Sequence, residues 1–140
     1  MIYCDTSLLV AALAREPNSG RAQEWLAAHG GDELCVSDWV VTEFAGALAF
    51  KQRTGQISAE LQGHIGTRWQ ELVTTTFAVN EVLRDAFELA ARYCNMQNSK
   101  LRSGDALHLA IALLGGHSLA TLDRAMAEAA VQVGVGVAPV

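Results

Sequence analysis

The chain has 140 residues, a length typical of one domain with a packed core. Apolar residues make up 51% of it and charged residues only 18%, fewer than the roughly one quarter usual in soluble domains. The net charge of −5 argues against binding of nucleic acid through a basic surface, so such a function would need another basis.

The composition also argues against membrane, secreted and zinc-binding classes. The longest uncharged stretch, residues 106–122, is interrupted by two histidines and two glycines, so it falls short of the roughly 20 apolar residues of a membrane span. Asp5 interrupts the N-terminal apolar run too early for a secretory signal. The three cysteines are widely spaced and form no CxxC pair. We therefore expect one cytoplasmic domain over residues 1–140.

In the first half of the chain, short apolar runs alternate with helical patterns. Residues 1–4 and 34–37 are typical of buried strands. Helices are predicted where apolar residues recur three and four positions apart. The predicted helices span residues 8–14, 18–29 and 39–53, and a fourth begins at Ser58 and carries an apolar stripe to Leu72.

The second half repeats the alternation. Strands are predicted over residues 74–79, 118–122 and 134–140, and helices over residues 80–95, 103–114 and 124–133. This order predicts an α/β fold with a central parallel sheet of about five short strands, flanked by helices on both faces. Ligands of such sheets bind beyond the carboxyl ends of the strands.

Two acids follow predicted strands, where such a sheet builds its sites. Asp5 comes directly after the first strand, and Asp123 repeats the order of strand, acid and helix. Each could instead cap the helix that follows it. Because both strands end in an acid, we expect a shared role rather than two independent caps.

Two further acids lie on apolar helices. Glu43 has only Trp39, Val40, Gly46 and Ala47 as neighbours one turn away, and none can pair with it. A buried carboxylate there would need a cation or would become neutral, unless it lies on a solvent-facing edge. Asp105 opens a helix too apolar for a surface position, although a first-turn acid also favours the helix dipole.

If the fold gathers these acids, their mutual repulsion favours divalent cations. Oxygen ligands select hard ions such as Mg²⁺ or Mn²⁺, which bind phosphates readily. His108, one turn after Asp105, is more simply a hydrogen-bonded core residue than a base or ligand. Arg102 and Arg124 are candidates for holding the phosphates of a substrate.

Four segments together resemble the PIN domain, and more narrowly the VapC toxins of type II toxin–antitoxin modules. They are IYCDTSLLVA, SDWVVTEFAGAL, LRSGDALHLAIA and LATLDRAMAEAA, and the resemblance covers essentially the whole chain. It implies a PIN fold whose acidic quartet is Asp5, Glu43, Asp105 and Asp123, all four catalytic and metal-binding. Hydroxyl groups that support the site would come from Thr6, Ser7 and Thr121.

The resemblance further implies an endoribonuclease that uses Mg²⁺ or Mn²⁺ and forms a homodimer. A cognate VapB-type antitoxin would occupy its active-site groove. Two alternatives stay open: an RNA-binding scaffold that does not cleave, and a nuclease outside any toxin–antitoxin module. A haloacid-dehalogenase-type phosphatase would need a second acid where Ser7 stands, and no GxGxxG motif of a dinucleotide site follows the first strand.

Overall fold

The computed structural model describes residues 1–30, 33–96 and 100–140. Its centre is a five-stranded parallel sheet with the strand order β3-β2-β1-β4-β5. The strands are β1 (Ile2–Cys4), β2 (Leu34–Ser37), β3 (Ala78–Asn80), β4 (Ser118–Ala120) and β5 (Val137–Ala138). The predicted α/β class and its parallel sheet are therefore confirmed.

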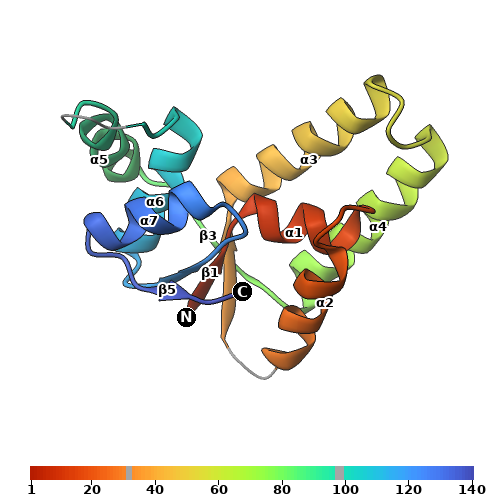
Figure 1. Cartoon of the computed structure of the whole chain (residues 1–140), viewed down its shortest axis with the longest axis horizontal. Coiled ribbons are helices and arrows are strands. Elements are labelled where there is room, and N and C mark those ends of the chain that lie inside the picture. Colours follow the sequence, from red (N-terminus) through yellow and green to blue (C-terminus); the bar gives the residue numbers. More distant parts are fainter. Residues whose placement is uncertain (31–32, 97–99) are drawn as a thin grey trace.

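Helices cover both faces of the sheet. Figure 1 shows the N-terminal helices α1 to α4 on one side and α5 to α7 on the other. The helices in the described ranges are α1 (Thr6–Leu13), α2 (Ser19–Ala28), α3 (Asp38–Arg53), α4 (Ala59–Thr75), α5 (Arg84–Cys94), α6 (Ser103–Leu114) and α7 (Arg124–Gln132). No helix within the described ranges is long and apolar enough to cross a membrane.

The central strands and α6 form the core. Tyr3 and Cys4 of β1 are fully buried, as are Cys35 and Val36 of β2. In α6, all residues from 106 to 112 are buried, as its uninterrupted apolar sequence predicts. Cys4 and Cys35 are free thiols in this core.

The boundaries of β3 differ from the prediction. Residues 74 and 75 were predicted to begin a strand, but they form the last turn of α4. The hydroxyl of Thr74 donates to the Gln70 carbonyl oxygen at 3.0 Å, and that of Thr75 to the Glu71 oxygen at 2.8 Å. Bonds of this kind let threonine continue a helix despite its preference for strands.

Three further elements, one helix and two strands, are shorter than predicted. Asn80 pairs with Ser37 in the sheet, so α5 begins at Arg84 rather than at residue 80. β4 ends at Ala120, and the terminal edge strand is confined to Val137–Ala138. These differences fall at element ends, where local sequence specifies structure least.

The register of β1 and β4 sets the position of the site. Cys4 pairs with Ala120, so the two strands end side by side. The backbone amide of Asp5 donates to the Ala120 carbonyl oxygen at 3.1 Å. The residues that follow the two strands therefore meet at the carboxyl ends of the strands, as do Asp5 and Thr121, which are 116 residues apart in sequence.

Candidate active site

Asp5 is a buried carboxylate with a full set of donors. Its Oδ1 accepts from the Leu8 backbone amide at 3.0 Å, which caps α1, and the Ser7 hydroxyl lies 2.9 Å from both oxygens. The Thr121 hydroxyl donates to Oδ2 at 2.8 Å. Burial raises the pKa of Asp5, and these hydrogen bonds offset the rise only in part.

Asp123 has the matching place after β4. Its Oδ1 accepts from the Met126 backbone amide at 3.0 Å and caps α7. Its own amide donates to the Thr121 hydroxyl at 2.9 Å, so Thr121 joins Asp123 to Asp5. Both acids therefore cap helices, and Thr121 also links them to each other, so they are not two independent caps.

Glu43 lies on α3, and its partners come from two other helices. Its Oε2 accepts from the Thr6 hydroxyl at 2.6 Å and from His108 Nε2 at 2.7 Å. Burial alone would raise the pKa of Glu43, but His108 and Thr6 outweigh that effect and hold the pKa below its ordinary value. Glu43 therefore has partners from distant elements that its helical neighbours did not indicate.

Asp105 lies in the first turn of α6, half-buried. Its Oδ2 accepts from the Arg102 backbone amide at 3.4 Å. Burial raises the pKa of Asp105, and the negative charge of Asp123 raises it further. The two carboxylates also line the same cavity.

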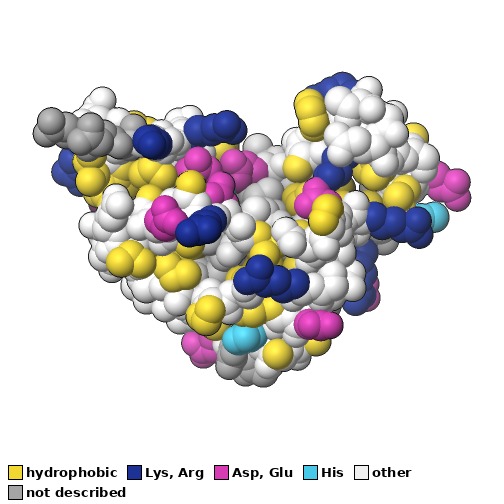
Figure 2. All heavy atoms as spheres, in the orientation of Figure 1, with side chains coloured by type: hydrophobic (Ala, Val, Ile, Leu, Met, Phe, Trp, Pro, Cys, Tyr) yellow, Lys and Arg dark blue, Asp and Glu magenta, His cyan; other side chains and the backbone are white. Residues whose placement is uncertain are grey.

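The four acids line one cavity of about 290 Å³ at the carboxyl ends of β1 and β4. Figure 2 shows acidic side chains gathered in the hollow between the α6 and α7 side of the molecule and α3. The structure thus brings together all four predicted acids with Thr6 and Ser7, and Thr121 lies directly behind them. The full lining is Asp5, Thr6, Ser7, Glu43, Ala47, Asp105, His108, Asp123 and Met126.

This donor set fits a hard divalent cation in its chemistry. It offers carboxylate and hydroxyl oxygens, and a cation would relieve the conditions that raise the pKa of Asp5 and Asp105. Yet within the described part of the chain, no three His, Cys, Asp or Glu side chains converge closely enough to hold an ion as they stand. Binding would therefore require the carboxylates to draw together.

His108 is the residue in this cavity that sequence reasoning undervalued. It is a buried, hydrogen-bonded core residue, as predicted, but its partners are Glu43 and the Tyr3 hydroxyl. Its place one turn after Asp105 was visible in the sequence. The contact with Glu43 was not, because 65 residues separate the two.

The two arginines predicted to bind phosphate lie at the N-termini of α6 and α7. Arg124 is exposed at the start of α7 and forms an ion pair with Glu128 at 3.1 Å. Arg102 is exposed immediately before α6, next to the first helical turn, which contains Asp105. Neither arginine lines the acidic cavity, and neither side chain is buried.

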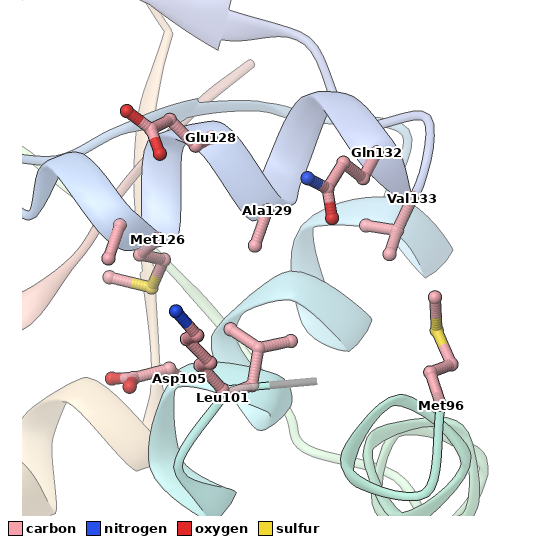
Figure 3. Close-up of a pocket in the computed structure, with 10 residues that line it drawn as sticks. Met96, Leu101, Asp105, Met126, Glu128, Ala129, Gln132 and Val133 are labelled. Atoms are coloured by element: carbon pink, nitrogen blue, oxygen red, sulfur yellow. The ribbon is translucent and has the colours of Figure 1, made fainter. Parts of the chain in front are cut away.

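A second cavity, of about 380 Å³, lies beside the first. Figure 3 shows Ala129 and Gln132 of α7, and Val133 directly after it, facing Leu101 and Met96 across the cavity. Asp105 and Met126 line both cavities. The acidic site therefore continues into a mainly apolar depression between α7, the start of α6 and the end of α5.

Comparisons with known proteins identify the family and the fold. The family model for the PIN domain matches residues 2–132. A search of curated proteins finds no match. Among solved structures, FitAcB from Neisseria gonorrhoeae has a TM-score of 0.76 at 20% identity, covering 98% of this chain and 96% of that one.

Two other solved structures have the same fold. VapC20 of Mycobacterium tuberculosis, a toxin that cleaves the sarcin–ricin loop, has a TM-score of 0.73 at 20% identity, covering 92% of this chain and 95% of that one. A toxin–antitoxin complex from Klebsiella pneumoniae has a TM-score of 0.63 at 20% identity, covering 88% and 87%. With a family match over residues 2–132, the chain belongs to the PIN domain family.

Proposed function

We propose that this protein is a metal-dependent endoribonuclease, and that it acts as the toxin of a VapBC-type toxin–antitoxin pair. One observation carries the proposal: four carboxylates from separate elements line a single cavity at the carboxyl ends of β1 and β4. Membership of a family of nucleases and likeness to a ribonuclease toxin support it. A nuclease fits a small, open acidic site better than a small-molecule enzyme does.

Asp5, Asp105, Asp123 and Glu43 would hold the Mg²⁺ or Mn²⁺ ion. A bound ion of this kind lowers the pKa of a water molecule and stabilises the charge on a phosphodiester. The chain supplies the rigidity: Ser7 and Thr121 fix the Asp5 carboxylate, and Thr6 fixes Glu43. The acidity of the site also reconciles the net charge of −5 with an RNA substrate.

The test is cleavage of structured RNA by purified protein with Mn²⁺ or Mg²⁺. We expect products with 5′-phosphate and 3′-hydroxyl ends, and no cleavage in EDTA. Asp105→Asn should reduce cleavage by about 10²-fold or more, because one charge of the site is lost. Asp85→Asn is the matched control, since Asp85 is also a first-turn acid but lies exposed on α5.

Cleavage that persists in EDTA, or an Asp105→Asn variant as active as Asp85→Asn, would contradict the proposal. Metal-dependent RNA binding without cleavage would favour the alternative of an RNA-binding scaffold.

The proposed protein partner is an antitoxin that covers the site. A solved structure of the same fold is a toxin–antitoxin complex, which supports this partner. The depression lined by Leu101, Ala129 and Val133 would accept apolar side chains of such a protein beside Asp105. Co-expression with the product of a short adjacent reading frame should suppress cleavage, and Ala129→Glu should restore it by placing a charge in the depression.

We further propose a homodimer formed through the open edge of the sheet. β3 is an edge strand, and Val79, Leu83, Phe87 and Leu114 around it are each more than 40% exposed. Exposed apolar side chains beside an unpaired strand edge are typical of an interface. Sedimentation velocity should give a dimer for the natural chain and a monomer for Leu83→Glu, whereas a monomeric natural chain would contradict the proposal.

A further inference from the structure

A chain of buried hydrogen bonds reaches the acidic cavity from inside the sheet. Ser37, the last residue of β2, lies 2.8 Å from the Tyr3 hydroxyl, oxygen to oxygen. That hydroxyl lies 2.9 Å from His108 Nδ1, and His108 Nε2 lies 2.7 Å from Glu43 Oε2. Ser37, Tyr3 and His108 are each at most 2% exposed. The chain thus links two central strands, through α6, to one carboxylate of the site.

One order of protons satisfies every member of this chain. The Val40 backbone amide donates to Ser37 Oγ at 3.3 Å, which leaves the Ser37 hydroxyl to donate to Tyr3. Tyr3 then donates to His108 Nδ1, and Nε2–H donates to Glu43. Buried polar groups without partners cost free energy, so this complete order is favoured. It places the imidazole proton on Nε2.

The geometry excludes other roles for His108. One ring nitrogen is used by Tyr3 and the other by Glu43, so neither has a lone pair or proton left for a metal ion or a water molecule. The side chain is also almost inaccessible to solvent. What remains is its effect on Glu43.

Glu43 is held at one oxygen by two partners. Its Oε2 accepts from His108 and from Thr6 at 2.6 Å. Its Oε1 lies beside Gly104, where an added Cβ atom would come within 3.0 Å of it, so this orientation depends on glycine at that position. A glutamate normally has several rotamers, and fixing one in advance removes the entropy cost of ordering it on binding.

We infer that His108 is a positioning residue, which, supported by Tyr3 and Ser37, holds the Glu43 carboxylate in the orientation in which it serves a bound divalent ion. The inference rests on the proposed metal-dependent function. Groups that orient a metal-site carboxylate in this way typically change metal affinity or activity by about 10- to 100-fold when they are removed.

Two substitutions distinguish the hydrogen bond between His108 and Glu43 from that between His108 and Tyr3. The amide of His108→Gln extends as far as Nε2 and can donate to Glu43, whereas that of His108→Asn extends only to Nδ1 and can pair only with Tyr3. We expect His108→Asn to raise the Mn²⁺ dissociation constant about tenfold or more, measured by electron paramagnetic resonance of free Mn²⁺. His108→Gln should stay within about threefold of the natural protein.

Two controls accompany the pair. His64→Asn makes the same change on an exposed helical position of α4 and should leave Mn²⁺ affinity unchanged. If neither His108 variant folds, Tyr3→Phe removes only the hydroxyl, and it should raise the Mn²⁺ dissociation constant several-fold. A merely structural His108 would make the Asn and Gln variants equal in affinity, and that result, or an unchanged Tyr3→Phe, would overturn the inference.

The outcome is separable from the nuclease proposal. A protein that binds Mn²⁺ but does not cleave RNA would end that proposal, while the comparison of affinities would still decide the role of His108. A protein that binds no Mn²⁺ would overturn the inference, because no bound ion would remain for Glu43 to serve.

Discussion

At the residue scale, the orientation of Glu43 depends on side chains from two other helices. Thr6 and His108 hold Oε2, and Oε1 lies beside Gly104, where an added Cβ atom would come within 3.0 Å of it. A displacement of even about 1 Å at such a group can cost on the order of 10²-fold in rate. Substitutions next to Glu43 should therefore change activity without a matching loss of stability.

Gly104→Ala tests this expectation. The new Cβ would meet Glu43 Oε1 at 3.0 Å, so the carboxylate must shift, and we expect RNA cleavage to fall at least about tenfold. Gly46→Ala is the control, because a Cβ there meets nothing within 4 Å. The control should keep full activity and gain roughly 0.5–1 kcal/mol in the free energy of unfolding. Equal activity of the two variants would contradict the expectation.

Burial of Asp5 should make the stability of the metal-free protein depend on pH. Its folded pKa is raised by burial, so its contribution to stability is present below its unfolded pKa and is lost as the pH rises through the folded pKa. Asp5→Asn stays neutral and avoids that loss. For metal-free protein, we expect the unfolding free energy of Asp5→Asn relative to the natural chain to increase as pH rises from about 4 toward 7. Urea unfolding at several pH values measures it, and a difference independent of pH would refute the prediction.

At the element scale, helix starts and site acids coincide. Asp5 and Asp123 each cap a helix through Oδ1, and each lines the cavity. The capping role does not exclude the site role, since one carboxylate has two oxygens. The local pattern of strand, acid and helix therefore serves both purposes.

Asp123 allows the two roles to be separated. Serine caps helices about as well as aspartate but carries no charge, so Asp123→Ser should fold with near-natural stability. Asp123→Ala should lose about 1 kcal/mol of unfolding free energy. Both should lose RNA cleavage to the same extent, measured alongside thermal unfolding. An active Asp123→Ser would show that the acid serves α7 alone.

At the scale of the whole molecule, folding concentrates negative charge at one edge of the sheet. The pKa values of Asp5 and Asp105 are both raised, so the metal-free fold bears a cost that a cation would relieve. Metal binding should accordingly be coupled to the stability of the entire chain.

Mn²⁺ should therefore raise the melting temperature. At a free concentration of about 100 times its dissociation constant, it should add ~2.7 kcal/mol, or roughly 10 °C for a chain of this size. Differential scanning calorimetry with and without Mn²⁺ measures the shift. Asp105→Asn should show little of it, and Asp85→Asn should show all of it. An equal shift in both variants would place the bound metal elsewhere.

The sequence by itself determined the architecture, because burial and periodicity are local signals. The apolar runs at residues 2–4 and 34–37, and the helical stripe of α6, predicted the parallel α/β fold. The same order placed Asp5 and Asp123 at strand ends. It misplaced residues 74 and 75, because a strand preference competes there with the continuation of a helix.

Only the tertiary structure decided which side chains meet. His108 and Glu43 are 65 residues apart, and Thr121 and Asp5 are 116 apart, so no local pattern reports either contact. The order of the strands brings them together. The contacts with His108 and Thr6 then lower the pKa of Glu43, while burial raises that of Asp5. The ionisation of these acids and the contacts between their side chains depend on long-range packing, which the periodicity of the sequence does not predict.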